Sequence, residues 1–591
     1  MSNRVFILLS FVLLYSCTTV INNPEITEQE LKYGVQYLAS EKLEGRLAGS
    51  HGGLKAANFI RNEFRKSGLV LVNQTGFQPF DVVLESTPGP GNLLTAGKKE
   101  FVLFDDYIPM EYSAEDTVEA TICFTGFGFD FERNGLAWHD YNGIDVTGKW
   151  IMVLRGSPEW DNNAYDLMEY SEDIYKSILA RDQGATGVLL VAGPSFSPDD
   201  KLDFSGLTQR SAGIPVLQIT RRLADSLLSS IQENIASLEQ DILKKNRRRS
   251  FEIPVVLRGI TDIEMKSAVA QNVVGILEGN DPVLKDEYIV VGAHFDHLGT
   301  GGKGSSSRKP DTVAIHCGAD DNASGTAALI ELAEKFSASS DHLRRSLIFA
   351  AFDAEELGLL GSKAFMRNLP VDSGSITAMI NIDMIGRLDA DRPLSVGGTG
   401  TSAEGDSLLK SLIPATGMKV ATTPDGYGPS DHATFYAKNI PVFFFTTGPH
   451  LEYHTPDDKP STLDYGGLKT ITNLICELVF DLNTRIPALT YREAGPKSPA
   501  GYSRKRHRIT LGIMPDFAGI ETSGLRADLV IKGQPAYAGG MKNGDIIVNI
   551  NGMQVKNIDD YMFCLARLKA GETIHVEVLR EGELKVLLIQ L

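Results

Sequence analysis

Histidine and acidic residues gather in five short motifs in the middle of the chain. Imidazole and carboxylate groups are ligands that zinc accepts in hydrolytic sites, and a bridging carboxylate can hold two ions about 3.5–4 Å apart. In chain order, the motifs are Gly292-Ala293-His294-Phe295-Asp296-His297, Gly318-Ala319-Asp320-Asp321-Asn322, Asp353-Ala354-Glu355-Glu356, Asn381-Ile382-Asp383-Met384 and Tyr453-His454-Thr455-Pro456-Asp457. Their composition predicts a site for two metal ions.

The spacing inside these motifs suggests separate roles for neighbouring side chains. His294 and Asp296 are two residues apart on an extended segment and point the same way. Asp296 could therefore accept the second imidazole N–H and fix the tautomer of His294. Glu355 and Glu356 are adjacent, so their side chains diverge. One of them could bind metal while the other acts as a general base on the attacking water.

Each acid also has an ordinary structural interpretation. Asp320 or Asp321, for example, could cap a helix that begins near Ala323. Three of the five motifs, however, directly follow an apolar strand, and sites in open α/β sheets form beyond the carboxyl ends of the strands. The combination of the motifs in one region therefore favours a functional site over isolated carboxylates.

The elements that must position these motifs lie between Asn272 and Leu482, where apolar strands alternate with amphipathic helices. The expected strands cover 288–291, 346–352, 378–382 and 442–445, and the main helices cover 323–336 and 463–482. This alternation predicts an α/β fold with a mostly parallel sheet and helices on both faces. Two more helices are expected between Glu28 and Gly68, on either side of a glycine-rich turn that contains Gly45 and Arg46.

The five motifs resemble those of the two-zinc aminopeptidase family of secreted bacterial enzymes, whose more distant relatives include glutamate carboxypeptidase and the transferrin receptor. The resemblance covers about Glu28 to Leu482, with a middle region inserted. It implies a zinc exopeptidase fold and two zinc ions per chain. The implied ligands are His294 and Asp383 on one zinc, Asp321 as the bridge, and Glu356 and His454 on the second zinc.

The same resemblance implies the remaining roles in the site. It makes Glu355 the general base and Asp296 the partner of His294, and it places the hydroxyl of Tyr453 against the tetrahedral intermediate. His432, in the motif Ser430-Asp431-His432, either lines the substrate pocket or is a structural histidine. The side chains interpreted as non-ligands are His51, His139, His297, His316, His450 and the thiol of Cys317.

Two accessory modules are expected around a peptidase domain at 28–110 and 256–485. The insert at 111–255 resembles a protease-associated domain, for example in Tyr141-Asn142-Gly143-Ile144-Asp145-Val146-Thr147-Gly148-Lys149-Trp150. A linker is expected at 486–507, and residues 508–591 resemble a PDZ domain with a carboxylate-binding loop at Leu511-Gly512-Ile513-Met514. Such a module could bind a peptide or a partner protein, or it could serve as a structural cap.

The N-terminus predicts export and a membrane anchor. Val5 to Tyr15 is a short apolar run that follows Arg4, as in a secretion signal. Leu14-Tyr15-Ser16-Cys17 resembles a bacterial lipoprotein cleavage box, in which Cys17 becomes the lipidated first residue. We therefore expect a signal peptide at 1–16, a tether at 17–27 and a lipid-anchored location in the bacterial cell envelope, either periplasmic or at the cell surface.

Charge and motifs together narrow the function. The 57 basic and 75 acidic residues give a net charge of −18, which excludes a nucleic-acid-binding protein. The predicted function is a zinc-dependent aminopeptidase that hydrolyses the N-terminal peptide bond of peptides. The alternatives are a carboxypeptidase or dipeptidase of the same superfamily, or an inactive binding or scaffold protein. The filled ligand positions and the presence of Glu355 favour the enzyme.

Overall fold

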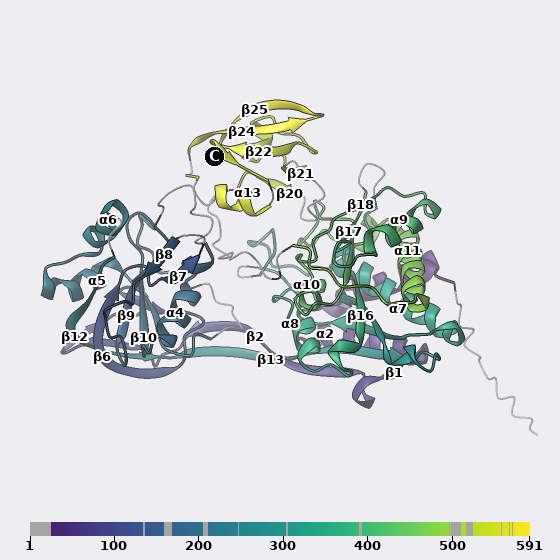
Figure 1. The fold of residues 1–591 in the computed structure, drawn as a ribbon, viewed down its shortest axis with the longest axis horizontal. Helices are drawn as coiled ribbons and strands as arrows, with labels where there is room; N and C mark the ends of the chain where they lie inside the picture. The colour runs from purple at the N-terminus through teal and green to yellow at the C-terminus, as the bar shows by residue number, and fades with distance from the viewer. Residues whose placement is uncertain are drawn as a thin grey trace, which may run out of the picture.

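The computed structural model describes residues 25–591, except for the gaps that follow. The gaps are 134–135, 159–167, 205–210, 246–247, 303–304, 389–392, 496, 498–509, 516–523, 557, 566–567 and 570. Over the described residues, the strands form three large sheets and a two-stranded ribbon (Figure 1). No helix in this part of the chain is long and apolar enough to cross a bilayer. The predicted signal peptide and Cys17 lie outside the described residues.

The nine-stranded sheet has four parallel strands at its centre and antiparallel strands at its edges. Its order is β1-β13-β15-β14-β16-β19-β17-β18, and β2 also pairs with β13. The parallel strands are β15 (Ser346–Phe352), β14 (Tyr288–His294), β16 (Ile376–Ile382) and β19 (Val442–Thr446). The others are β1 (Val70–Leu71), β2 (Phe77–Pro88), β13 (Ile263–Leu277), β17 (Leu394–Gly397) and β18 (Val420–Thr422).

Helices cover both faces of this sheet, which confirms the predicted α/β class. One face carries α1 (Glu28–Leu38), α2 (His51–Lys66), α7 (Gly325–Ala338) and α11 (Tyr465–Thr484). The other face carries α8 (Leu360–Arg367) and α10 (His432–Tyr436), and α9 (Gly405–Leu412) lies near the β17 edge. Alternate residues of β14 point to opposite faces of the sheet. Ile289 and Val291 belong to the hydrophobic core under α1, α2, α7 and α11, and Val290 belongs to the core under α8 and α10.

The eight-stranded sheet contains strands between Leu93 and Thr261, a stretch that includes the insert expected at 111–255. Its order is β4-β3-β12-β6-β9-β10-β11-β5. The strands are β3 (Leu93–Ala96), β4 (Lys99–Phe101), β5 (Tyr107–Pro109), β6 (Asp116–Thr125), β9 (Trp150–Leu154), β10 (Gly187–Val191), β11 (Val216–Ile219) and β12 (Ser250–Thr261). β3 pairs both with its neighbour β4 and with the distant β12, and β5 pairs with the distant β11.

Smaller elements complete the insert. The ribbon is β7 (Asp130–Arg133) with β8 (Leu136–His139), and the helices are α3 (Met168–Ser171), α4 (Asp173–Asp182), α5 (Arg221–Leu228) and α6 (Ile235–Lys245). β13 begins directly after β12 ends and pairs along its length with β2. Figure 1 shows this long antiparallel pair running along the bottom between the insert and the nine-stranded sheet.

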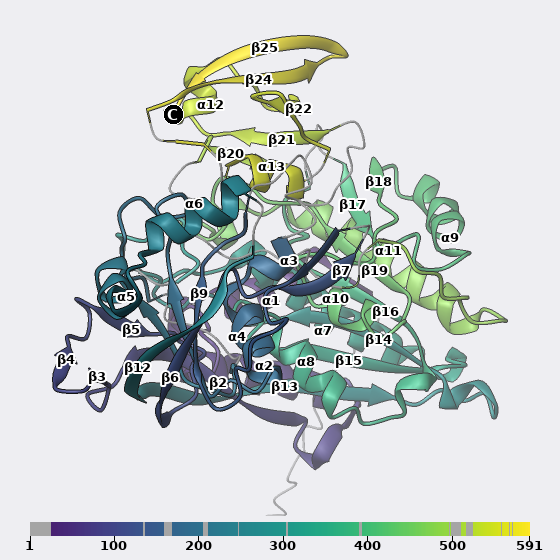
Figure 2. The same cartoon turned by 60° about the vertical axis from the view of Figure 1, so that its left-hand side comes forward.

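The six-stranded C-terminal sheet stands apart from the other two sheets in both views (Figures 1 and 2). Its elements are β20 (Ile513–Pro515), β21 (Leu525–Val530), β22 (Ile546–Ile550), β23 (Met553–Gln554), β24 (Thr573–Arg580), β25 (Glu583–Gln590), α12 (Pro535–Ala538) and α13 (Ile558–Leu565). Part of the expected linker is attached to the main domain, because the Ala494 N–H donates to the hydroxyl of Tyr436 at 2.9 Å.

Candidate metal centre

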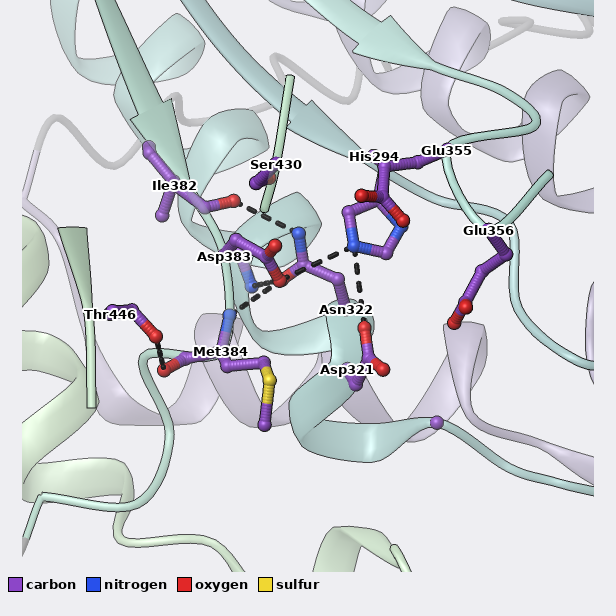
Figure 3. A network of polar contacts seen from close by, with 12 residues as sticks. His294, Asp321, Asn322, Glu355, Glu356, Ile382, Asp383, Met384, Ser430 and Thr446 are labelled. Atoms are coloured by element: carbon purple, nitrogen blue, oxygen red, sulfur yellow. Dashed lines mark hydrogen bonds and ion pairs between the residues drawn. The ribbon is translucent and has the colours of Figure 1, made fainter. Parts of the chain in front are cut away.

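The candidate site lies at the carboxyl ends of three neighbouring strands. β14 ends at His294, β15 ends just before Asp353, and β16 ends just before Asp383. These strands are parallel neighbours, so the residues that follow them meet at one edge of the sheet. Asp321 joins them from the irregular turn Ala319–Ser324 ahead of α7. Figure 3 shows Asp321, His294 and Asp383 directed toward one another.

The first group of potential ligands is His294, Asp321 and Asp383. Nε2 of His294 lies 3.3 Å from Oδ1 of Asp321 and 3.3 Å from Oδ1 of Asp383. Burial lowers the pKa of His294, but the charges of Asp383 and Glu355 outweigh it and raise that pKa well above its ordinary value. Burial also raises the pKa of Asp383. The group thus concentrates negative charge around one buried imidazole.

The second group shares Asp321. Nε2 of His454 lies 3.1 Å from Oδ2 of Asp321 and 3.2 Å from Oε2 of Glu356. Burial opposes ionisation of Glu356, yet His454 and its other hydrogen-bond partners lower the pKa of this carboxyl to about 2. The two oxygens of Asp321 therefore face different imidazoles, as a bridging carboxylate requires.

The distances between these atoms match the spacing of ligands around zinc. Zinc binds nitrogen and oxygen at about 2.0–2.2 Å with tetrahedral geometry, so two ligand atoms on one ion are about 3.3–3.5 Å apart. The four imidazole–carboxylate distances are 3.3, 3.3, 3.1 and 3.2 Å, longer than the usual charge-assisted hydrogen bond. Four of the five residues are buried, and Glu356 is partly buried. The donor set therefore fits zinc in both groups.

His297 was expected to be a bystander, but the structure places it in the second group. Its Nδ1 lies 2.8 Å from Oε1 of Glu356 and 3.7 Å from Oδ2 of Asp321, and these three residues could hold a metal ion. The 2.8 Å contact has the length of a usual charge-assisted hydrogen bond, whereas the contacts of His454 are longer, at 3.1 and 3.2 Å. The sequence offered one signal for His297, since it ends the same motif as His294, but its side-chain position depends on how the chain turns after β14.

Asp296 and Glu355 lie behind and beside the ligands. The carboxylate of Asp296 accepts the backbone N–H groups of Glu355 at 3.0 Å and Glu356 at 3.3 Å, and its Oδ1 lies 3.6 Å from Nδ1 of His294. Asp296 therefore anchors the turn that carries both glutamates, and its contact with His294 is longer than a hydrogen bond. Burial, joined by the charges of Glu356, Asp431 and Asp383, raises the pKa of Glu355 well above its ordinary value.

Tyr453 and His432 flank the ligand groups. The ring of Tyr453 stacks on that of His454 with centroids 3.9 Å apart. Burial and the charges of nearby carboxylates raise the pKa of Tyr453 well above its ordinary value, so its hydroxyl stays protonated. His432 is buried and stacks on Phe444 at 4.3 Å, and burial lowers its pKa to about 3. His432 is therefore a neutral imidazole.

A set of polar residues holds the ligand-bearing turns together. Asn322 accepts the backbone N–H of Met384 at 3.2 Å and donates to the carbonyl of Ile382 at 2.9 Å, so it links the Asp321 turn to the Asp383 turn (Figure 3). Asp458 accepts the backbone N–H groups of Asp320 and Asp321 at 3.0 and 3.1 Å. Asp458 has no assigned role in the sequence motifs, because it lies one residue beyond the last of them.

Three further histidines of the described chain, His450, His316 and His139, contact residues outside the two groups. Nε2 of His450 lies 3.3 Å from Asp320, and Nε2 of His316 hydrogen-bonds the hydroxyl of Ser307 at 2.8 Å. His139 pairs with Asp130 in the insert, and His51 is the first residue of α2.

Comparison with known proteins places this site in a family. Residues 272–479 match the model of peptidase family M28, and residues 527–580 match a PDZ domain. Residues 272–479 are a peptidase family M28 domain. This M28 domain contains all of the potential ligands described above, and the C-terminal sheet is a PDZ domain.

Individual relatives are similar over part of their length. A probable leucine aminopeptidase of Trichophyton verrucosum is 28% identical over 34% of this chain and 55% of its own length. A probable glutamate carboxypeptidase of Arabidopsis thaliana is 27% identical over 68% of this chain and 56% of its own length. The chain thus spans about half the length of these curated relatives. Among solved structures, an aminopeptidase from Aneurinibacillus sp. strain AM-1 is 22% identical, with a TM-score of 0.46 over 79% of this chain and 95% of that one.

Proposed function

We propose that this protein is a two-zinc aminopeptidase that removes N-terminal residues from peptides. The observation that carries the proposal is the ligand-like spacing of 3.1–3.3 Å between two imidazoles and three carboxylates. His294 and Asp383 would hold one zinc, Glu356 and His454 the other, and Asp321 would bridge them. His297 would donate a hydrogen bond to the second oxygen of Glu356 and so orient that ligand.

The residues around the ligands supply the rest of the chemistry. When bound, the zinc pair acidifies a water and polarises the scissile carbonyl. Glu355 would accept the proton of the attacking water and return a proton to the leaving amine, because burial and neighbouring acids raise its pKa and so its affinity for a proton. The protonated hydroxyl of Tyr453 would donate a hydrogen bond to the developing oxyanion.

An aminopeptidase must also hold the free α-amine of its substrate. Asp383 and Glu355 are buried acids in the same cluster, and their negative charge would attract an α-ammonium group. A carboxypeptidase would need a cation for the substrate's terminal carboxylate instead. Arg308 is near Tyr453, but its Nη1 donates to the carbonyl of Leu451 at 3.1 Å. The surplus of acids therefore favours recognition of an amine.

Three related substrates test this proposal. The full chain should cleave a leucine anilide, leave the N-acetylated anilide intact and leave an N-acetylated dipeptide with a free carboxylate intact. The activity should disappear with a zinc chelator and return with zinc. Equal turnover of the free and acetylated anilides would contradict an aminopeptidase, and cleavage of the acetylated dipeptide alone would establish the carboxypeptidase alternative.

The other modules extend the proposal. We propose that the insert is a protease-associated domain that shapes access to the site, and that the PDZ domain binds a peptide or a partner protein at the edge of its sheet. Cys17 would carry a lipid that anchors the enzyme in the bacterial cell envelope.

A further inference from the structure

The glycine-rich turn between α1 and α2 has no role in the site described so far, yet it sends one charged side chain into the core. Arg46 is fully buried. Its guanidinium donates four hydrogen bonds to backbone carbonyls: from Nε to Phe295 at 2.7 Å, from Nη1 to Leu38 at 2.6 Å and to Cys317 at 2.7 Å, and from Nη2 to Gly318 at 2.9 Å. An arginine whose guanidinium hydrogen bonds all go to backbone carbonyls holds the backbone segments that carry those carbonyls together.

Three of the four carbonyls that Arg46 binds belong to the two segments that bring ligands into the centre, and the fourth is that of Leu38 at the end of α1. Phe295 lies between His294 and Asp296, and Gly318 lies three residues before Asp321. Arg46 is 249 residues from the first of these carbonyls and 272 residues from the last. One side chain from outside the matched M28 region thus joins the end of β14 to the turn ahead of α7.

The backbone of the same turn fits against the same segment. The N–H of His297 donates to the carbonyl of Arg46 at 3.2 Å, and the N–H of Gly299 donates to the carbonyl of Gly45 at 3.0 Å. Gly45 has a φ of 71°, and a Cβ there would lie 2.3 Å from the carbonyl oxygen of Gly299. The turn therefore approaches the ligand segment as closely as glycine allows.

The charge of Arg46 faces the back of the carboxylate cluster. Burial lowers the pKa of Arg46, while the charges of Asp321, Asp296 and Asp458 act in the opposite direction. Asp458 accepts the backbone N–H of Asp321 at 3.1 Å, and Arg46 binds the carbonyl of Gly318 at the start of the same turn. Side chains therefore hydrogen-bond both the backbone N–H groups and a backbone carbonyl of the Asp321 turn.

We propose that Arg46 is a positioning residue of the metal centre: its guanidinium sets the separation between the His294 segment and the Asp321 turn. This inference rests on the proposed zinc function, but it concerns metal binding alone. A substitution that removes the guanidinium but keeps the positive charge should therefore leave the distance between the His294 segment and the Asp321 turn less well fixed. Lysine at this position keeps the charge, but it has a single nitrogen with three donors in place of the fork.

Arg345 provides a matched control in the same domain. It is also buried, its Nη1 donates to the carbonyl of Leu482 at 3.1 Å, and its Nε pairs with Glu287 at 2.7 Å. It precedes β15 at the opposite end of the sheet and contacts no ligand-bearing segment in these hydrogen bonds. Arg345→Lys should therefore lower stability without altering metal binding.

The test compares zinc affinity in the full-length parent, Arg46→Lys and Arg345→Lys by competition with a fluorescent chelator. Arg46→Lys should bind zinc about 10- to 100-fold more weakly, as for other residues that orient ligands, and its cobalt-substituted form should show a shifted visible absorption spectrum. Arg345→Lys should keep the parent affinity and spectrum. If Arg46→Lys is too unstable to purify without metal, the rise of its melting temperature with free zinc yields the same affinity.

Two results would overturn the inference: parent-like affinity and cobalt spectrum in Arg46→Lys, or an equal loss of affinity in both arginine variants. A parent chain that binds no zinc would overturn it together with the proposed function. A parent chain that binds two zinc ions but leaves free-amine anilides intact would sink only the aminopeptidase proposal, because the Arg46 comparison needs no turnover.

Discussion

The two ends of the central parallel strands bury polar groups in opposite ways. At the amino ends, Arg345 pairs with Glu287, and Asn483 donates to the carbonyl of Arg345 at 2.6 Å. At the carboxyl ends, acids surround two imidazole groups at 3.1–3.3 Å, longer than the usual charge-assisted hydrogen bond. Among the described side chains, Nδ1 of His294 and Nε2 of His297 are buried there without a hydrogen-bond partner.

This difference separates a structural network from a binding site. The amino-end groups satisfy one another, so they need nothing beyond the protein. Burial raises the pKa values of Glu355 and Asp383, and the charges of neighbouring acids raise them further. A buried surplus of negative charge is costly unless a cation neutralises it. The comparison therefore assigns a cation to one end of the sheet only.

The largest expected effect separates the two adjacent glutamates at the carboxyl end. Glu355→Gln should lower kcat by about 10²–10⁴-fold and keep the zinc content, because it removes the base but no ligand. Glu356→Gln is the matched control and should lose zinc as well as activity. Turnover assays with zinc analysis by mass spectrometry check both variants. Loss of zinc in Glu355→Gln would mean that the roles of base and ligand are exchanged.

The next effect separates the two histidines beside Glu356. His454→Ala should leave one zinc per chain, because it removes a ligand. His297→Ala should keep two zinc ions and weaken the second by about 10- to 100-fold, because it removes only an orienting hydrogen bond. Zinc titration of both variants gives the answer. The reverse order of losses would make His297 the ligand.

A third effect concerns the oxyanion. Tyr453→Phe should reduce kcat by about 10²–10³-fold with KM nearly unchanged, since the phenol acts mainly in the transition state. Steady-state kinetics on a leucine anilide check this, and the zinc content should match the parent. A changed KM with an unchanged kcat would place Tyr453 in substrate binding instead.

The smallest expected effect concerns a buried acid that lies outside the candidate metal centre. Glu331 in α7 is buried, and burial together with the charges of Glu30 and Glu334 raises its pKa to about 8. The folded state therefore holds the proton more tightly than the unfolded state, and stability falls as pH rises from about 4.5 to 8. Glu331→Gln should stabilise the fold by about 1–3 kcal/mol above pH 8 and by little below pH 4.5. Denaturant unfolding at pH 5 and pH 9 measures this, and an equal effect at both would contradict it.

Much of the site follows from local sequence signals. Acids and histidines that come directly after apolar strands must meet at one edge of a parallel sheet, so His294, Glu356 and Asp383 were predicted to converge without knowledge of the contacts. The parallel centre and the helices α7 and α11 were equally visible from hydrophobic periodicity. Each of these signals lies within a short stretch of sequence, so it can be recognised without a structure.

The rest depends on contacts between distant segments. The position of His297 is set by the path of the chain after β14, and Arg46 acts through carbonyls more than 240 residues away. β3 and β5 precede the expected insert at 111–255, yet they pair with β12 and β11 far along the chain. Neither spacing nor composition contains such information, so these features emerge only from the folded structure.

The most direct test of the cation assignment is the number of zinc ions bound to the native full-length chain. Native mass spectrometry after dialysis against trace zinc should find two ions per chain in the parent. Asp321→Asn should bind fewer, because this carboxylate faces both imidazoles. A parent chain that binds no zinc, or two ions that survive unchanged in Asp321→Asn, would contradict the account.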